Sequence, residues 1–199
     1  MADMEKTGKN LEGRGFRVHR FASGAEAADY LVQTLHGTSI GIGGSVTIDT
    51  LGVYDRLCES NEVFWHWKNH ASETRERAGK AETYLCSANG VSENGEIVNI
   101  DGFGNRVAGT IYGPERVFLV VGRNKIAPDL TGAIDRARNI AAPLNARRLN
   151  RHTPCAVGEP RCHDCRSPEK VCGVMTVFFM PPTSIKEFHV LLVNDDLGY

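Results

Sequence analysis

The segment Arg116–Gly122 is the most hydrophobic strand candidate in the chain, and it constrains the fold more than any other segment. Central strands of parallel sheets have this character, because helices cover both of their faces. Around it, segments typical of strands and helices alternate over the first 142 residues, ending in an amphipathic helix at 129–142. This alternation predicts an α/β fold with a mainly parallel, doubly wound sheet.

Local signals predict the other elements. Ser23 is suited to cap a helix, with Glu26 able to bond back to the Ser23 amide, and Asn94-Gly95 is typical of a hairpin turn. Pro143 is expected to break or restart the helix that precedes it. Further strands are expected at 15–21, 39–44, 62–67, 83–88, 96–100, 174–180 and 187–194, and helices from 45, around 72–80 and at 104–112. Residues 1–14 are interpreted as a polar arm or helix, and residues 15–199 as a single domain.

Composition excludes several functions. The 199 residues carry 23 Lys and Arg against 24 Asp and Glu, so no overall positive field would gather nucleic acid. No segment approaches the roughly 18 consecutive apolar residues of a membrane span, and the acidic N-terminus lacks the apolar core of a signal peptide. We therefore expect a cytoplasmic protein without a membrane span or a nucleic-acid partner.

The glycine-rich turn Gly41–Thr47 follows a short strand and leads into a helix. Glycines let the backbone approach a ligand closely, and amides at a helix start favour anions. Within the turn, the expected ligand-binding residues are Gly43, Gly44, Ser45 and Thr47. The turn matches neither the phosphate-binding Walker loop nor the full dinucleotide-binding spacing, so a purely structural tight turn explains it about equally well.

Two further polar groups follow the ends of other expected strands. The first group comprises Asn89, Glu93, Asn99, Asp101, Asn105 and Arg106, and the second contains Lys125. Ligands of open α/β sheets bind at the carboxyl ends of the strands, which would bring both groups to the glycine turn. We expect a pocket for a small carboxylate or phosphate there. The alternative is that the asparagines form turns and Arg106 pairs with a surface carboxylate.

Four cysteines are clustered in the segment 155–172, which lacks periodicity. Cys155, Cys162, Cys165 and Cys172 form a C-x6-C-x2-C-x6-C pattern. Because disulfides are rare in the cytosol, such a cluster favours a metal site. Four thiolates suit tetrahedral zinc or an iron–sulfur cluster of four irons. A redox-active dithiol, or thiols that no longer bind metal, remain the alternatives.

The combined motifs resemble the LUD family of lactate-utilisation proteins over about residues 10–199. The matching segments are Gly43-Gly44-Ser45 with Thr47, Ala88–Val91, Asp101-Gly102, Gly104–Ala108, Val121–Lys125, Ala141–Arg147 and Leu192–Gly198. The resemblance implies a fold of the NagB/RpiA/CoA-transferase-like type, in which the first glycine turn receives an anion. It also implies a link to the oxidation of L-lactate to pyruvate within an iron–sulfur assembly, which favours a 4Fe–4S cluster over zinc at the four cysteines. No catalytic residue follows from it.

Three functions remain open at this point. The first is a subunit or accessory factor of lactate oxidation, which binds a small anionic metabolite and a metal centre and acts with other lactate-oxidation subunits. The second is a stand-alone isomerase or acyl-transfer enzyme that uses the anion pocket, with Glu93 or Asp101 as its general base. The third is a zinc-stabilised regulatory protein that binds a ligand without catalysis.

Overall fold

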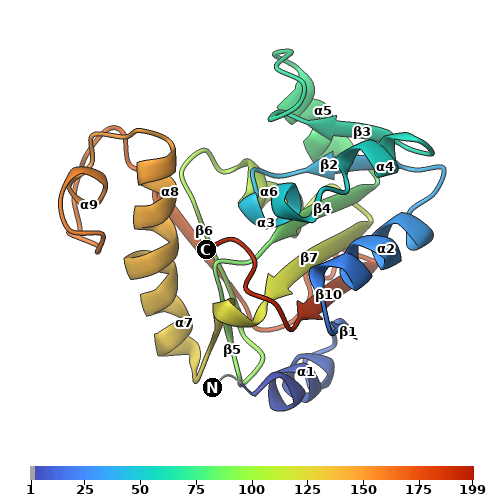
Figure 1. Cartoon of the computed structure of the whole chain (residues 1–199), viewed down its shortest axis with the longest axis horizontal. Coiled ribbons are helices and arrows are strands. Elements are labelled where there is room, and N and C mark those ends of the chain that lie inside the picture. The colour runs from blue at the N-terminus through green and yellow to red at the C-terminus, as the bar shows by residue number, and fades with distance from the viewer. Residues whose placement is uncertain (1–2) are drawn as a thin grey trace.

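A six-stranded parallel sheet forms the centre of the computed structural model, which describes residues 3–199 (Figure 1). The strand order is β1-β10-β7-β4-β2-β3, and every neighbouring pair is parallel. The strands are β1 (Arg17–Phe21), β2 (Ser39–Ile42), β3 (Glu62–Trp65), β4 (Thr83–Ser87), β7 (Arg116–Gly122) and β10 (Glu187–Val193). β7 lies between β10 and β4 and is buried after its first residue. The expected α/β fold with a mainly parallel sheet is confirmed.

A second sheet of four strands has the order β8-β5-β6-β9. Its strands are β5 (Gly90–Ser92), β6 (Ile97–Asp101), β8 (Ile126–Ala127) and β9 (Val174–Phe178). β5 and β6 form the predicted antiparallel hairpin, and Gly95 in its turn has a φ of 90°, which favours glycine. β9 pairs antiparallel with β6, so the last two strands of the chain belong to different sheets.

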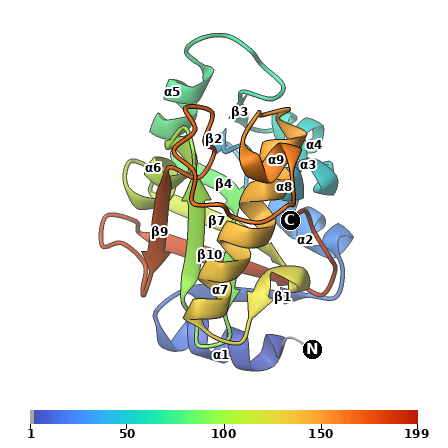
Figure 2. The same ribbon diagram turned by 90° about the vertical axis from the view of Figure 1, so that its left-hand side faces the viewer.

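The helices lie on both sides of the main sheet and along the second sheet (Figure 2). They are α1 (Met4–Gly13), α2 (Gly24–Thr34), α3 (Val46–Leu51), α4 (Tyr54–Cys58), α5 (Thr74–Lys80), α6 (Asn105–Ile111), α7 (Leu130–Arg136), α8 (Ala142–Arg148) and α9 (Pro154–Val157), with short turns η1 (Arg123–Lys125) and η2 (Ala137–Ala141). Ser23 caps α2 as predicted, but the Glu26 carboxylate accepts from the Ala22 amide instead of the Ser23 amide. Among residues 3–199, no helix is both long and apolar enough to cross a membrane.

The elements α7, η2 and α8 join into one long rod that carries Pro143 without a break (Figure 2). Pro143 is the second residue of α8 and lies inside the continuous rod, next to a π-helical turn of the kind that accommodates a proline within a helix. The π-helical turn η2 precedes it, and the Ala142 amide bonds to the Ala137 carbonyl. Since the helix continues past Pro143, it carries Asn145 and Arg148 on to the site described below.

Consecutive residues of β7 point into the cores on opposite faces of the main sheet. Phe118 packs into the cluster that contains Leu31 of α2 and Ile48 of α3. Leu119 packs into the other cluster, which contains Leu11 of α1 as well as residues of the second sheet. The sheet is therefore covered on both faces, as its uninterrupted hydrophobic sequence predicts.

Candidate functional site

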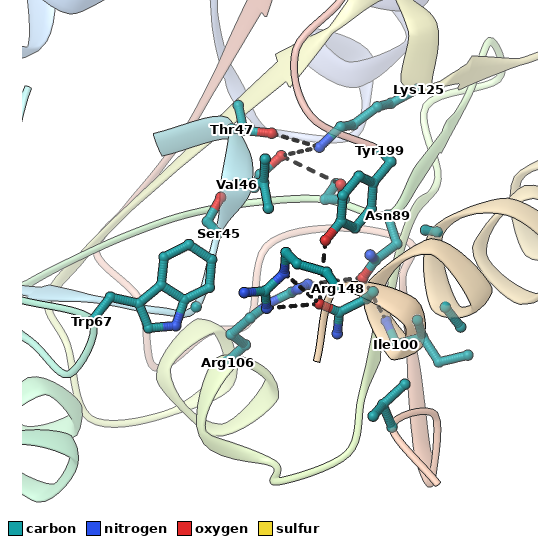
Figure 3. Close-up of a pocket in the computed structure, with 17 residues that line it drawn as sticks. Ser45, Val46, Thr47, Trp67, Asn89, Ile100, Arg106, Lys125, Arg148 and Tyr199 are labelled. Atoms are coloured by element: carbon teal, nitrogen blue, oxygen red, sulfur yellow. Dashed lines mark hydrogen bonds between the residues drawn. The ribbon is translucent and has the colours of Figure 1, made fainter. Parts of the chain in front are cut away.

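A small pocket lies where the chain leaves the carboxyl ends of β2, β4 and β7 (Figure 3). Its empty volume, counted with its open mouth, is about 440 Å³. We call it the inner pocket. Its lining comprises Gly44, Ser45, Val46, Thr47, Trp67, Ser87, Ala88, Asn89, Ile100, Arg106, Lys125, Ala141, Ala142, Asn145, Arg148, Val171 and Tyr199. The carboxyl ends of the strands are the edge at which open α/β sheets bind their ligands.

Six of the eight predicted ligand-binding residues line the inner pocket, namely Gly44, Ser45, Thr47, Asn89, Arg106 and Lys125. The other two lie beside it. A side chain added at Gly43 would place its Cβ 2.8 Å from Cγ of Arg106, so only glycine allows that approach. Asn105 lines the outer cleft described below, and its carbonyl accepts a hydrogen bond from the Tyr84 hydroxyl at 3.0 Å.

Lys125 is the most deeply buried charged side chain of the pocket, with an exposed fraction of 2%. Its Nζ donates to Oγ1 of Thr47 at 2.7 Å and to Oγ of Ser87 at 2.8 Å. Each of these hydroxyls also donates its own hydrogen to a main-chain carbonyl, Thr47 to Leu197 and Ser87 to Val120. Two buried hydroxyls thus hold the amine in place, and no carboxylate contacts it among the described residues.

Arg106 approaches the inner pocket from α6 and is held by two amide side chains. Its Nη2 donates to Oδ1 of Asn89 at 2.8 Å and to Oδ1 of Asn99 at 2.9 Å. Its Nε is buried and has no hydrogen-bond partner among residues 3–199. Asp101 lies next to this cluster but accepts from the backbone amides of Arg106 and Phe103, so its carboxylate caps the start of α6.

Two more arginines add to the positive charge. Arg148 of α8 lies on the rim, where its guanidinium stacks over Trp67 with Cζ 4.5 Å from the ring centroid. The same guanidinium donates to Oδ1 of Asn145. Arg136 of α7 lies behind the pocket wall and donates to the main-chain carbonyls of Asn124 and Asn89.

The charge of the inner pocket is not balanced by the protein. Among residues 3–199, none of Arg106, Lys125, Arg136 and Arg148 forms an ion pair, and no Asp or Glu lines the pocket. Burial and then the neighbouring guanidiniums of Arg136 and Arg106 hold the pKa of Lys125 well below its usual value. Burial also lowers the pKa of Arg136 to about 10. The lowered pKa values show that positive charge is costly at this site, and a bound anion would offset that cost.

The inner pocket opens into a larger groove, which we call the outer cleft. Both share Gly44, Trp67, Arg106 and Arg148 among their lining residues. The outer cleft continues past His66, His70, Arg75, Asp101, Phe103 and Arg151 to Pro168, Glu169, Lys170 and Val171 of the cysteine segment. Burial, followed by Arg75 and His70, lowers the pKa of His66. The shared lining residues make the inner pocket and the outer cleft one continuous depression.

The two candidate bases have different surroundings. Glu93 lies away from the inner pocket, where its carboxylate accepts from the Asp3 amide and from Nζ of Lys6 and so fastens α1 to the hairpin. The Asp3 amide and Lys6 lower the pKa of Glu93 accordingly. Asp101 lines the outer cleft at the helix cap already described.

The cysteine segment, residues 155–172, runs along the rod formed by α7, η2 and α8 (Figure 2). All four thiols are free and partly buried. Cys162 accepts a hydrogen bond from Nη2 of Arg138 at 3.4 Å. The pKa of Cys172 is raised by burial and by the nearness of the other three thiols. Within residues 3–199, however, no three Cys, His, Asp or Glu side chains form a ready-made metal site.

The sequence prediction missed several lining residues. Trp67 follows β3, a strand end that the prediction did not assign to the pocket, whereas Arg148 ends α8 and Tyr199 belongs to the last stretch of the sequence. Asn145 lies inside the Ala141–Arg147 motif of the family resemblance, so that motif was the one available signal for this side of the pocket.

Comparison with known proteins agrees with this fold. The model of the LUD domain family matches residues 4–193. No curated protein matches the chain. A crystal structure of a DUF162 family protein from Deinococcus radiodurans superposes with a TM-score of 0.56 at 12% identity, covering 96% of this chain and 95% of that one, and this likeness supports the fold alone. Since the family match spans nearly the whole sequence, the chain belongs to the LUD domain family.

Proposed function

We propose that this protein acts in lactate utilisation by binding a small anionic metabolite, a carboxylate or a phosphate, in the inner pocket. The observation that carries the proposal is that two guanidiniums, Arg106 and Arg148, and the amine of Lys125 line this pocket without any Asp or Glu side chain. A guanidinium can bind a carboxylate or a phosphate through two parallel hydrogen bonds. The unpartnered Nε of Arg106 further supports a ligand at this position.

Its role would be that of a subunit or accessory factor in the oxidation of L-lactate to pyruvate, together with other subunits and in the cytoplasm. Family membership supports the link to lactate utilisation. The open outer cleft supports an accessory role, because it leaves the pocket accessible from one side of the molecule.

The proposal includes a metal centre at Cys155, Cys162, Cys165 and Cys172. The donor set fits, because free thiols are the ligands of iron–sulfur clusters and of structural zinc, and all four lie on one segment. We favour a 4Fe–4S cluster, which would carry electrons, over zinc, which would only order the segment. Arg138 of the rod donates a hydrogen bond to the sulfur of Cys162 and so helps to hold this part of the segment in place.

Calorimetric titration with L-lactate, pyruvate, oxalate and phosphate tests the anion site directly. We expect at least one of these anions to bind the wild-type protein. The variant R106M should lose about tenfold to a hundredfold in affinity, because a hydrogen bond to a charged group contributes about 1.5–3 kcal/mol. R106K retains the charge and should lose less.

The matched control is R123M. Arg123 lies outside the inner pocket and pairs with Asp196 at the surface, so its replacement should leave anion affinity unchanged. Equal losses in R106M and R123M, or no binding of any of the four anions to the wild type, would contradict the proposed function.

A further inference from the structure

Lys125 has a geometry that anion binding alone does not require. Its amine belongs to the lining of a pocket whose other basic side chains are arginines, and it is nearly fully buried. Both hydroxyls that contact Nζ have already donated their hydrogens, Thr47 to the Leu197 carbonyl and Ser87 to the Val120 carbonyl. They must therefore accept hydrogens from Nζ.

The direction of these bonds fixes what remains on the nitrogen. A neutral amine has two hydrogens and one lone pair, and both hydrogens are donated to Thr47 and Ser87. The lone pair is then left for the pocket that Lys125 lines. Figure 3 shows the amine directed towards Thr47 on one side of the pocket, with Arg106 and Arg148 on the other.

The surroundings of Lys125 favour the neutral amine. Burial lowers its pKa, the guanidiniums of Arg136 on α7 and Arg106 on α6 lower it further, and the buried Cys86 thiol on β4 acts more weakly in the opposite direction. A lysine that is desolvated beside other cations is a nucleophile at neutral pH.

We propose that Lys125 is a nucleophile that forms a reversible imine with a carbonyl compound bearing a carboxylate or phosphate. The inference rests on the proposed function in that the arginines bind the anionic group of the same molecule. They would thereby hold its carbonyl carbon against the amine, so that Arg106 acts as a binding residue and Lys125 as a catalytic one.

The step needs no further reactant. The Nζ lone pair attacks the carbonyl carbon, and the electrons of the carbonyl double bond move to its oxygen. Both amine hydrogens then leave with that oxygen as water, and the carbon–nitrogen double bond forms. The reaction is therefore the condensation of one amine with one carbonyl group, without oxidation or reduction.

Trapping with borohydride tests this inference. The protein is incubated with pyruvate, with glyceraldehyde 3-phosphate or with acetone, then reduced, and the modified lysine is located by peptide mass spectrometry. Reduction adds hydride to the imine carbon and converts the adduct into a stable secondary amine. We expect an adduct on Lys125 with pyruvate or with the phosphate compound, and little with uncharged acetone. An adduct with pyruvate alone would indicate a carboxylate ligand, and an adduct with glyceraldehyde 3-phosphate alone would indicate a phosphate ligand.

Two variants serve as matched controls. K125M should lose the adduct, whereas K80M, which removes an exposed lysine that pairs with Glu76 at the surface, should retain it. R106M should reduce labelling of Lys125 at low probe concentration by about tenfold or more. Mapping the adduct on the wild-type protein keeps the test valid even if K125M folds poorly.

Several results would overturn the inference. Labelling spread over surface lysines such as Lys68 and Lys80, or equal labelling by acetone, would show unspecific chemistry. Calorimetric binding of pyruvate or phosphate without any trapped adduct on Lys125 would refute the imine while leaving the proposed function intact. Absence of both binding and adduct would refute both.

Discussion

His19 and His189 stack on each other inside the molecule, and His189 also stacks on Phe118 with ring centroids 4.2 Å apart. Nε2 of His19 lies 3.0 Å from Nδ1 of His189. Only one of these two nitrogens can carry a hydrogen in this contact, because two N–H groups facing each other would repel. Burial is the main cause that lowers the pKa of both rings, and Arg17 lowers both further. Glu187 acts against the shift at His189 but does not reverse it. The folded protein therefore favours the neutral form of both rings more strongly than the unfolded chain does.

This pair predicts a loss of stability on mild acidification. As the pH falls below the ordinary histidine pKa of 6.5, the unfolded chain takes up protons that the folded pair does not, and unfolding becomes more favourable. The free energy of unfolding should thus fall as the pH is lowered from about 7 to about 5. The fall for each histidine is at most about 1.4 kcal/mol per pH unit. Urea unfolding of the H189Q variant should show a smaller slope over this range.

The exposed His36 provides the control, because H36Q should keep the wild-type slope. His66, whose pKa is also lowered, contributes to the slope that remains in H189Q. An H189Q protein with an unchanged dependence on pH would contradict the assignment.

Residues next to strand ends were predictable from the sequence, and residues that reach the pocket from elsewhere were not. Lys125 and Asn89 follow strands closely, and parallel strands bring such positions to one edge. Arg148 reaches the pocket because the rod continues past Pro143, where the sequence predicted that the helix breaks or restarts. The contacts of Glu93 with α1 depend on tertiary packing, which no local pattern contains.

At the level of elements, the cysteine segment is the part of the fold that a metal would change most. The segment begins within the short helix α9, and residues 158–173 form neither helix nor strand. Hydrogen bonds with the rod hold the segment. The Cys162 amide donates to the side chain of Asn139, and Arg147 donates to the carbonyls of Ala156 and Gly158. The main cores lie elsewhere.

We therefore predict that the metal orders this segment without determining the stability of the main sheet. Protein purified without air should contain iron and sulfide and be brown, and removal of the metal should make residues 155–172 more sensitive to protease. The double variant C162S/C165S should lose the metal but melt at nearly the wild-type temperature. C58S removes an exposed cysteine outside the segment and should keep the metal. A colourless protein with bound zinc would refute the iron–sulfur cluster, and full metal content in the double variant would refute the site.

The arrangement of strands into two sheets was not predictable either. The alternating pattern predicts a parallel sheet, and the Asn94-Gly95 signal predicts the β5–β6 hairpin. No local pattern indicates that β9 extends this hairpin while β10 inserts between β1 and β7 of the main sheet, because both are short apolar segments. Strand order depends on which faces must be covered, and this is decided by the whole molecule.

At the scale of the whole molecule, α1 joins the two sheets. Leu11 is fully buried in the cluster that contains Leu119 of the main sheet and Ile97 of the second sheet. Around it, Asn10 donates to the Glu93 carbonyl of the hairpin, and Arg14 forms an ion pair with Glu96. On the other side, α1 pairs through Glu12 with Arg20 of β1, and these contacts make the helix part of the folded body.

The variant L11A should therefore destabilise both sheets together. Truncating a fully buried leucine costs about 2–5 kcal/mol, through lost burial and the cavity left behind. Because Leu11 contacts one shared core, we expect hydrogen exchange to accelerate in β6 and in β7 by similar factors, within one cooperative unfolding transition. The variant K9A, on the exposed side of the same helix, should change the free energy of unfolding by no more than about 0.5 kcal/mol. Faster exchange confined to β5 and β6 would show instead that the second sheet unfolds on its own and that α1 stabilises only the hairpin.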